Sequence, residues 1–272
     1  MPPVSDTGPS LSRASVTATA IIPARYQSSR LPGKALADIA GRPMIEHVYR
    51  RAAAASSIAR VIVATDDRRI FDVVRGFGGE AVMTSPAHQS GTDRLAEAAA
   101  SIDAGLIVNV QGDEPLLAPD TIDAAVSAFA EAPADTAPAL EMSTLRRRVT
   151  DDAELHNPNV TKVVVDTDGY ALYFSRAPIP FTRAGQPPAP AWAHVGLYVY
   201  RRATLLRLAA LPPTAMERAE ALEQLRALEH GIRIKTVITS HATIGVDTRE
   251  DLERVRALVA GAKEPAYTRV TS

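Results

Sequence analysis

The sequence predicts an α/β protein built on a Rossmann-like, doubly wound and mostly parallel sheet, with a small antiparallel β insertion. Three observations lead to this prediction. Short apolar runs alternate with helical patterns, and each run is largely hydrophobic, as in strands covered on both faces. The 272 residues, 46% of them hydrophobic, are enough to bury a sizeable core. Alternating strands and helices imply right-handed crossovers and a ligand crevice at the carboxyl ends of the strands.

The first half of the chain supplies three pairs of a strand and a helix. The strands are predicted in the runs TAIIP, RVIVATD and LIVNVQGDEP, at 19–23, 60–66 and 106–115. The helices that follow them are predicted in MIEHVYRRAAAA, RRIFDVVRGF and TIDAAVSAFAEA, at 44–55, 68–77 and 121–132. Pro43 suits the first turn of the first helix. Asp66 or Asp67 can cap the second helix, and Gly78 can end it.

The second half opens with an antiparallel hairpin. The residues TDG at 167–169 have the composition of a hairpin turn and lie between the β-rich runs VTKVVVD and YALYFSR. The Pro-rich segment 182–193 is predicted as an exposed loop. The later elements are predicted as a strand at 194–201, one long amphipathic helix over 214–230 closed by Gly231, a strand at 233–239, a last extended piece at 241–247 and a helix over 248–260. Thr248 and Asp251 have capping-box spacing in that last helix.

Charge and composition exclude several classes of function. A formal net charge of −1 gives the surface no field that would recruit nucleic acid or a membrane. The chain has no cysteine, which excludes a thiol nucleophile, a disulfide and a Cys-ligated zinc site and fits a cytoplasmic protein. No apolar run approaches the length of a membrane span, and the N-terminal stretch lacks the apolar core of a signal peptide. We expect a disordered extension at 1–16, a single domain at 17–261 and a flexible tail at 262–272.

Carboxylates follow the buried strand that ends in VQGDEP. Gly112 allows a close approach to the backbone, and Asp113 and Glu114 come next. Oxygen ligands at such a strand end suit Mg²⁺, which proteins hold with one or two carboxylates plus substrate phosphates. A solvated turn or a helix N-cap is the alternative explanation. Asp247 in GVDT lies at a predicted junction between a strand and a helix, where it could share the same ion or only favour the helix N-terminus.

The loop IIPARYQSSRLPGK carries three cations and no acid. Arg25, Arg30 and Lys34, with the backbone amides of a Gly-containing loop, are suited to a polyphosphate. The loop matches neither G-x-x-x-x-G-K-[ST] nor G-x-G-x-x-G, so it is not one of the common phosphate-binding motifs, and a solvated basic loop is the alternative. A second polar loop, HQSGTDR at 88–94, leads into the helical run LAEAAA.

Eight segments, taken in order from about residue 17 to residue 260, resemble the 3-deoxy-manno-octulosonate cytidylyltransferase (CMP-Kdo synthetase) family. They are IIPARYQSSRLPGK, VIVATDD, HQSGTDRLAE, VNVQGDEP, NPNVTKVVVDTDGYALYFSRAPIP, HVGLYVYR, EALEQLR and GVDTREDLERVR. The resemblance implies a nucleotidyltransferase fold, with a nucleotide-binding half at about 17–135 and a sugar-binding and dimerisation part at about 136–245. It also implies a homodimer that uses CTP and 3-deoxy-manno-octulosonate (Kdo), with Mg²⁺, to make CMP-Kdo and pyrophosphate for lipopolysaccharide synthesis.

The same resemblance implies roles for individual residues. The implied catalytic residues are Arg25, Lys34, Asp113 and Asp247, of which Asp113 and Asp247 would hold Mg²⁺. The implied nucleotide-binding residues are Ala24, Arg25, Lys34, Gln89, Ser90, Gly91, Arg94 and Asp113. The implied Kdo contacts are Gln111, Arg176, His194, Tyr198, Glu223 and Gln224, of which Arg176 provides a positive charge and the others provide donors and acceptors for hydroxyl groups.

Two other functions compete with this hypothesis. A CMP-sialic acid synthetase or a sugar-1-phosphate nucleotidyltransferase would share the fold and differ in the acceptor. A nucleotide-binding module without catalysis would tolerate Asp113→Ala with only a shift in nucleotide affinity, whereas an enzyme should lose turnover by orders of magnitude.

Overall fold

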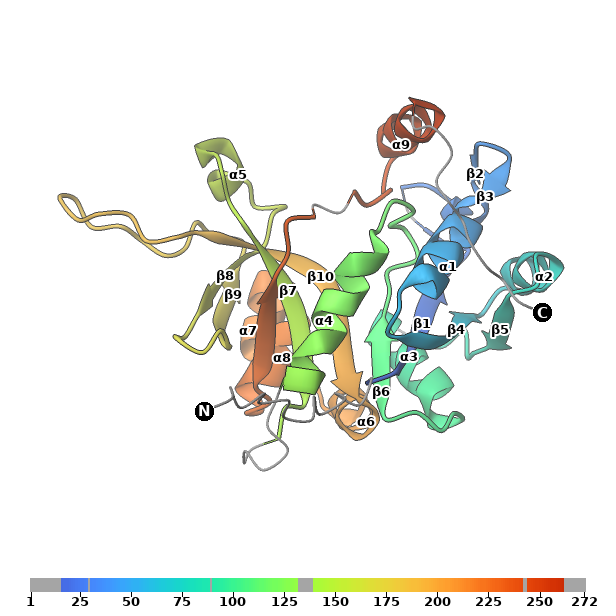
Figure 1. The fold of residues 1–272 in the computed structure, drawn as a ribbon, viewed down its shortest axis with the longest axis horizontal. Coiled ribbons are helices and arrows are strands. Elements are labelled where there is room, and N and C mark those ends of the chain that lie inside the picture. Colours follow the sequence, from blue (N-terminus) through green and yellow to red (C-terminus); the bar gives the residue numbers. More distant parts are fainter. Residues whose placement is uncertain (1–15, 29, 89, 132–138, 242–243, 262–272) are drawn as a thin grey trace, which may run out of the picture.

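The computed structural model describes residues 16–28, 30–88, 90–131, 139–241 and 244–261 (Figure 1). The predicted N-terminal extension up to residue 15 and the predicted tail at 262–272 lie outside these ranges. Within them, no helix has both the length and the apolar character needed to cross a membrane.

The structure confirms the α/β class with a mostly parallel central sheet. The strands of this sheet are β1 (Ala18–Ala24), β4 (Ile58–Thr65), β5 (Glu80–Met83), β6 (Leu106–Asn109), β7 (Met142–Arg148), β8 (Lys162–Val165), β9 (Ala171–Ser175), β10 (Trp192–Arg201) and β11 (Ile234–Ile238). They pair in the order β11, β7, β10, β6, β1, β4, β5, with the hairpin of β8 and β9 attached to β10. The pairs along this order are parallel except those made by β10, which runs antiparallel to both β6 and β7.

The helices lie on both faces of the sheet, together with a separate two-stranded hairpin of β2 (Asp38–Ile39) and β3 (Arg42–Pro43). The helices are η1 (Lys34–Leu36), α1 (Met44–Ala54), α2 (Arg68–Gly76), α3 (Gly91–Ala100), α4 (Pro119–Glu131), α5 (Asp152–His156), α6 (Arg202–Ala210), α7 (Ala215–Glu220), α8 (Gln224–Glu229) and α9 (Arg249–Gly261). Alternate residues of the strands divide the core: Ile22 and Val108 pack with α1, α2 and α4, whereas Ile21 and Ile107 pack with α3, α6 and α8. Figure 1 shows α1 and α4 on the face of the sheet that is toward the viewer.

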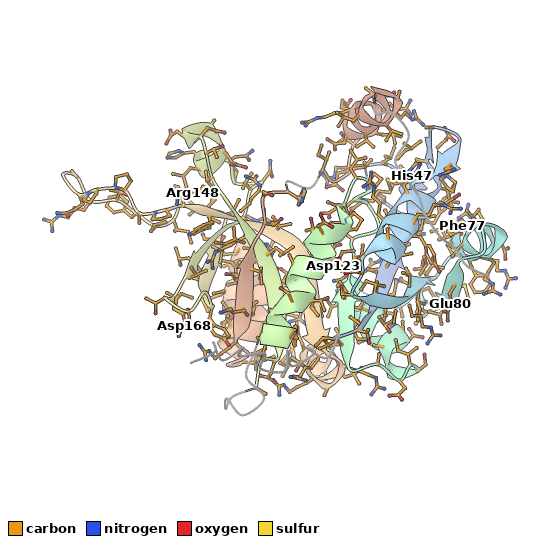
Figure 2. The ribbon with its side chains drawn as sticks, in the orientation of Figure 1. His47, Phe77, Glu80, Asp123, Arg148 and Asp168 are labelled. Atoms are coloured by element: carbon orange, nitrogen blue, oxygen red, sulfur yellow. The ribbon has the colours of Figure 1, made fainter. Side chains whose placement is uncertain are left out.

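Hydrogen bonds at the helix starts match several sequence predictions. Asp67 caps α2 through the backbone amide of Arg69. Thr248 and Asp251 form the predicted capping box at the start of α9, with reciprocal bonds between side chain and backbone of 3.2 and 2.9 Å. A further side chain joins two elements: Asp123, labelled on α4 in Figure 2, accepts hydrogen bonds from Ser56 and Ser57 ahead of β4.

The hairpin was predicted correctly, and the Pro-rich loop beside it is confirmed as irregular and exposed. Gly169 has a φ of +80°, which suits the turn between β8 and β9. The part of this loop that precedes β10, residues 182–191, projects from the body as a long arm at the left of Figure 1. β10 begins at Trp192, two residues before the predicted strand.

Two predictions in the second half were wrong. The single long helix over 214–230 is two helices, α7 and α8, because Ala221 adopts a left-handed conformation with a φ of +51°. The break carries Glu223 to the N-cap of α8. The described part of 241–247 is not a strand, so Asp247 follows an irregular segment and not a strand. β5 and β7 were also missed, β7 because its three terminal arginines interrupt the apolar pattern of a strand.

Candidate functional site

Three of the predicted site residues meet at one point. The Lys34 ammonium lies 2.7 Å from Asp113 Oδ2 and 3.0 Å from Asp247 Oδ1, and it also donates to the Val246 carbonyl. The backbone amide of Val246 donates to the Asp113 carbonyl over 2.8 Å, which joins the segment before α9 to the loop that follows β6. Asp113 and Asp247, which are far apart in sequence, are therefore both within reach of one cation.

The negative charges of Asp113 and Asp247 are balanced by cationic side chains of the protein. Burial alone lowers the pKa of Lys34, but the Asp113 and Asp247 carboxylates outweigh burial and raise it above its ordinary value. Arg30, which is largely exposed, adds a second contact of 2.9 Å to the other oxygen of Asp247. A cation at this position is thus stabilised by two carboxylates, and Lys34 stays protonated at neutral pH.

Glycines allow the close packing on which this arrangement depends. A Cβ at Gly112 would lie 2.9 Å from the Pro23 carbonyl oxygen, so only glycine lets the end of β6 approach the end of β1 this closely. Gly33 has a φ of +71° and donates from its amide to the Tyr26 carbonyl over 2.8 Å. These contacts fold the cationic loop back so that Lys34 faces Asp113.

The predicted phosphate-binding residues line a small groove beside these carboxylates. Its volume is about 80 Å³. It is lined by Pro23, Ala24, Arg25, Lys34, Ala35, Gln111, Gly112 and Asp113. Arg25 thus lies at the same groove as Lys34, the other residue to which the resemblance assigns the phosphates.

A larger cavity of about 210 Å³ adjoins this groove, since both are bordered by Pro23 and Gln111. Its lining is Pro23, Gly91, Thr92, Asn109, Gln111, Met142, Tyr198, Tyr200, Leu208, Glu223 and Gln224. Four of the six predicted sugar contacts are in this set. The sequence did not predict five of the lining residues: Thr92, Asn109, Met142, Tyr200 and Leu208. They come from five different helices and strands, so no local motif connects them.

The acid in this cavity is Glu223. Its Oε2 accepts a hydrogen bond of 2.9 Å from the Thr92 hydroxyl. Burial raises the pKa of Glu223 above its ordinary value, although the hydrogen bond from Thr92 and the charge of Arg226 oppose the shift. The carboxyl is therefore easier to protonate than an exposed glutamate.

His194 lies behind Tyr198 and does not line the cavity. Its Nε2 is 2.9 Å from the Thr144 hydroxyl, and its ring centroid is 5.3 Å from that of Tyr198. Burial lowers the pKa of His194 to about 3, so the imidazole is neutral at neutral pH. Burial also raises the pKa of Tyr198 well above its ordinary value, which keeps its phenol protonated.

Arg176 also lies away from the cavity lining. Its guanidinium donates to the carbonyls of Pro158, Glu220 and Ala221 over 3.0, 2.7 and 3.3 Å. These bonds hold the break between α7 and α8, so Arg176 supports the backbone that carries Glu223 to the cavity.

Arg94 is buried beneath the loop that precedes α3. Its side chain has no exposed surface and contacts Asp66 Oδ2 at 2.7 Å and the Thr84 hydroxyl. Ser90 and Asp93 form a capping box at the start of α3, with two bonds of 3.0 Å. Gly91 borders the larger cavity, and Gln89 lies outside the described residues.

The protein offers two carboxylate ligands for a hard divalent cation. Within the residues that the structure describes, no group of three or more His, Cys, Asp or Glu side chains could hold a metal ion. Asp113 and Asp247 supply two carboxylates, the number with which Mg²⁺ is usually held when substrate phosphates and water complete the shell.

Comparison with known proteins gives closely similar relatives. The Cytidylyltransferase family profile matches residues 19–234. A 3-deoxy-manno-octulosonate cytidylyltransferase of Geobacter sulfurreducens is 56% identical over 247 residues, covering 87% of this chain and 97% of the relative. Its counterpart from Syntrophotalea carbinolica is 55% identical over 251 residues, covering 89% and 98%.

Solved structures agree with the sequence comparisons. A CMP:2-keto-3-deoxy-manno-octonic acid synthetase complexed with CTP is 47% identical, with a TM-score of 0.84 over 90% of this chain and 98% of the other. A putative glucose-1-phosphate thymidylyltransferase from Bacillus anthracis, with a TM-score of 0.62 and 17% identity over 92% of this chain and 98% of the other, shares the fold alone.

Proposed function

Because the chain belongs to the 3-deoxy-manno-octulosonate cytidylyltransferase family, we propose that it transfers CMP from CTP to Kdo and releases pyrophosphate. The observation that carries the proposal is the meeting of Lys34, Asp113 and Asp247 in the groove that adjoins the larger cavity. The groove has the cations Arg25 and Lys34 for a triphosphate, and the cavity has polar groups that can pair with sugar hydroxyls.

In this reaction the anomeric oxygen of Kdo forms a bond to the α-phosphorus of CTP. The bond from that phosphorus to the oxygen bridging to the β-phosphate breaks, and pyrophosphate leaves with the electron pair while the anomeric proton is released. Both reactants are anions, so holding them together in line is the main demand on the protein.

Arg25 and Lys34 would meet that demand on the nucleotide side. Arg25 lines the groove, and its planar guanidinium can bind two phosphate oxygens at once. Lys34 already donates to two carboxylates and to the Val246 carbonyl, so a phosphate oxygen would replace one of these three acceptors. We propose that Ala24, Gln89, Ser90, Gly91 and Arg94 serve the nucleotide as well, Arg94 by supporting the loop from below.

Asp113 and Asp247 would hold Mg²⁺. When bound, that ion would screen the phosphates and make the anomeric hydroxyl more acidic. The two carboxylates already converge on one positive charge, which supports this assignment.

The sugar would occupy the larger cavity. Gln111, Tyr198, Glu223 and Gln224 border it and can pair with hydroxyl groups. His194 and Arg176 would act from behind, His194 through Tyr198 and Arg176 through the backbone at Ala221.

Pyrophosphate release tests the proposed function. With CTP, Kdo and Mg²⁺ present, we expect continuous release, and omission of any one of the three should stop it. CTP turnover that does not require Kdo would contradict the proposal. A panel of acidic sugars and sugar phosphates in place of Kdo tests the alternative acceptors.

We further propose that the chain works as a cytoplasmic homodimer that contacts its partner through the insertion. Large apolar side chains are exposed there and at the neighbouring sheet edge: Leu172 is 62% exposed, Phe181 88% and Ile238 57%. Arg148, labelled at the base of the arm in Figure 2, lies over the Trp192 ring at 5.6 Å in the same region. Light scattering coupled to size exclusion should give twice the monomer mass of 29.0 kDa.

A further inference from the structure

One hydrogen bond crosses between the two halves of the site. The Thr92 hydroxyl, in the first turn of α3, donates to Glu223 Oε2 over 2.9 Å, although the residues are 131 positions apart. Thr92 is 4% exposed, and both side chains border the larger cavity. The helix that follows the nucleotide-side loop therefore contacts the acid on the sugar side directly.

Glu223 depends on this contact for its position. Among the described residues, the Thr92 hydroxyl is the one donor that hydrogen-bonds the Glu223 carboxyl, and Glu223 Oε1 is buried without a hydrogen-bond partner. The nearest cation, Arg226, stays 3.7 Å from Oε1 because its guanidinium is paired with both oxygens of Glu217, at 2.8 and 2.5 Å. Without Thr92, no hydrogen bond in the described structure would fix the rotamer of this carboxyl.

Resting on the proposed function, we propose that Thr92 is a positioning residue for Kdo: its hydroxyl holds the Glu223 carboxylate so that the acid can accept a hydrogen bond from the sugar. Glu223 lines the cavity, and an ionised carboxylate has about four acceptor sites, so it can accept from a sugar hydroxyl while Oε2 accepts from Thr92. Thr92 thereby makes the sugar side of the site depend on the position of α3.

Several charged or titratable groups surround Glu223 and set the direction of a pH effect. Arg226 and the Thr92 hydrogen bond lower the pKa of Glu223, whereas burial and the nearby Glu217 and Asp93 raise it, and Tyr198 and Tyr200 face it from β10. Loss of the Thr92 donor should therefore raise the pKa of Glu223 further. If the ionised acid is what accepts from the sugar, the acid limb of the kcat/KM profile for Kdo moves to higher pH.

The test compares Thr92→Val, which keeps the shape and removes the donor, with Thr92→Ser, which keeps the donor. Thr92→Val should raise the KM for Kdo about tenfold, the ratio expected for the loss of one hydrogen bond to a charged acceptor, while the KM for CTP changes less than about twofold. In Thr92→Val the acid limb of the kcat/KM profile for Kdo should move to higher pH. In Thr92→Ser both the KM for Kdo and the position of this acid limb should be close to those of the wild type.

A double-mutant cycle separates positioning from a general structural effect. If Thr92 acts through Glu223, Thr92→Val should add little to Glu223→Ala, so the two effects on the KM for Kdo should not be additive. Thr121→Val is a matched control, because Thr121 is also buried and its hydroxyl has no hydrogen-bond partner among the described residues. It should leave both KM values unchanged.

Three outcomes would overturn the proposal: additive effects in the cycle, an unchanged pH profile in Thr92→Val, or equal losses in Thr92→Val and Thr92→Ser. Thermal unfolding of each variant shows whether it is folded, and the cycle in the Glu223→Ala background still decides if Thr92→Val alone is less stable. The wild-type assay tests the proposed function separately, since absence of Kdo-dependent pyrophosphate release there would refute the function before any variant is compared.

Discussion

Replacement of Lys34 by methionine should have opposite effects on metal binding and on turnover. In the structure the Lys34 ammonium holds Asp113 at 2.7 Å and Asp247 at 3.0 Å, the same carboxylates that are proposed for Mg²⁺. In the absence of CTP, the ammonium would therefore compete with Mg²⁺ for these carboxylates. With CTP present, the triphosphate gives Lys34 another acceptor, and the competition is relieved.

The magnitude follows from the contacts that are lost. A hydrogen bond between charged groups contributes about 1.5–3 kcal/mol, and about 1.4 kcal/mol corresponds to a tenfold change in affinity. Lys34 is only 19% exposed, so solvent screens its contact with Asp113 incompletely. Releasing that one carboxylate should raise the affinity of the nucleotide-free protein for Mg²⁺ by about tenfold. Turnover should fall by about 10² to 10³, because a positive charge on the phosphates is lost.

Isothermal titration with Mg²⁺, with and without CTP, measures the first effect, and pyrophosphate release measures the second. Arg30→Ala is the control, since Arg30 is 63% exposed and its pair with Asp247 should contribute less than about 1 kcal/mol. If Lys34→Met weakened Mg²⁺ binding in the nucleotide-free protein, as Asp113→Ala is expected to do, Lys34 would be a support for the metal site and not a competitor.

Three further predictions concern the groove, the sheet edge and the pH dependence of stability. Arg25→Ala should weaken CTP use more than Arg30→Ala in KM measurements, because Arg25 lines the groove; equal and negligible losses would indicate a solvated basic loop. Gly112→Ala should lower the free energy of unfolding by about 1–3 kcal/mol in urea titrations, since its Cβ would be 2.9 Å from a β1 carbonyl oxygen, whereas Gly105→Ala, which has open space, should not. Below pH 6.5 the unfolded chain protonates His194 and the folded chain, with a pKa of about 3, does not. As the pH is lowered from 6.5 toward 3, the free energy of unfolding should thus fall by up to about 1.4 kcal/mol per pH unit. The substitution His194→Asn should make this dependence on pH weaker.

Residues at the ends of apolar strands could be predicted from the sequence, because strand, turn and charge patterns are local. The run VNVQGDEP pointed to Asp113 as a candidate site residue, and the cationic loop pointed to Arg25 and Lys34. All three residues line one groove. The convergence of Asp113 and Asp247 was implied by the family resemblance and not by any local pattern, since it depends on the backbone bond between Val246 and Asp113 across more than a hundred residues.

Other parts of the site depend on tertiary contacts that leave no periodic pattern. The helical pattern over 214–230 continues through Ala221, yet the helix breaks there at a left-handed residue, and Arg176 binds the carbonyls of Glu220 and Ala221 at the break. Arg94 looked available to a nucleotide in the sequence and is instead buried against Asp66. In both cases the contact joins residues that are far apart in the sequence, so a local pattern could not indicate it.

The antiparallel direction of β10 explains why sugar and nucleotide sides meet at one edge. Parallel strands bring only their carboxyl ends to that edge, and β6 ends there with Asn109, followed by Gln111. β10 pairs Tyr198 with Asn109 and then runs back along β6, so the residues before Tyr198 lie beyond the end of β6. There the Gly196 carbonyl accepts from the Gln111 side chain over 3.4 Å. β10 therefore brings Tyr198 to the cavity from the middle of a strand, whereas β1 and β6 reach the cavity with Pro23 and Asn109 at their carboxyl ends.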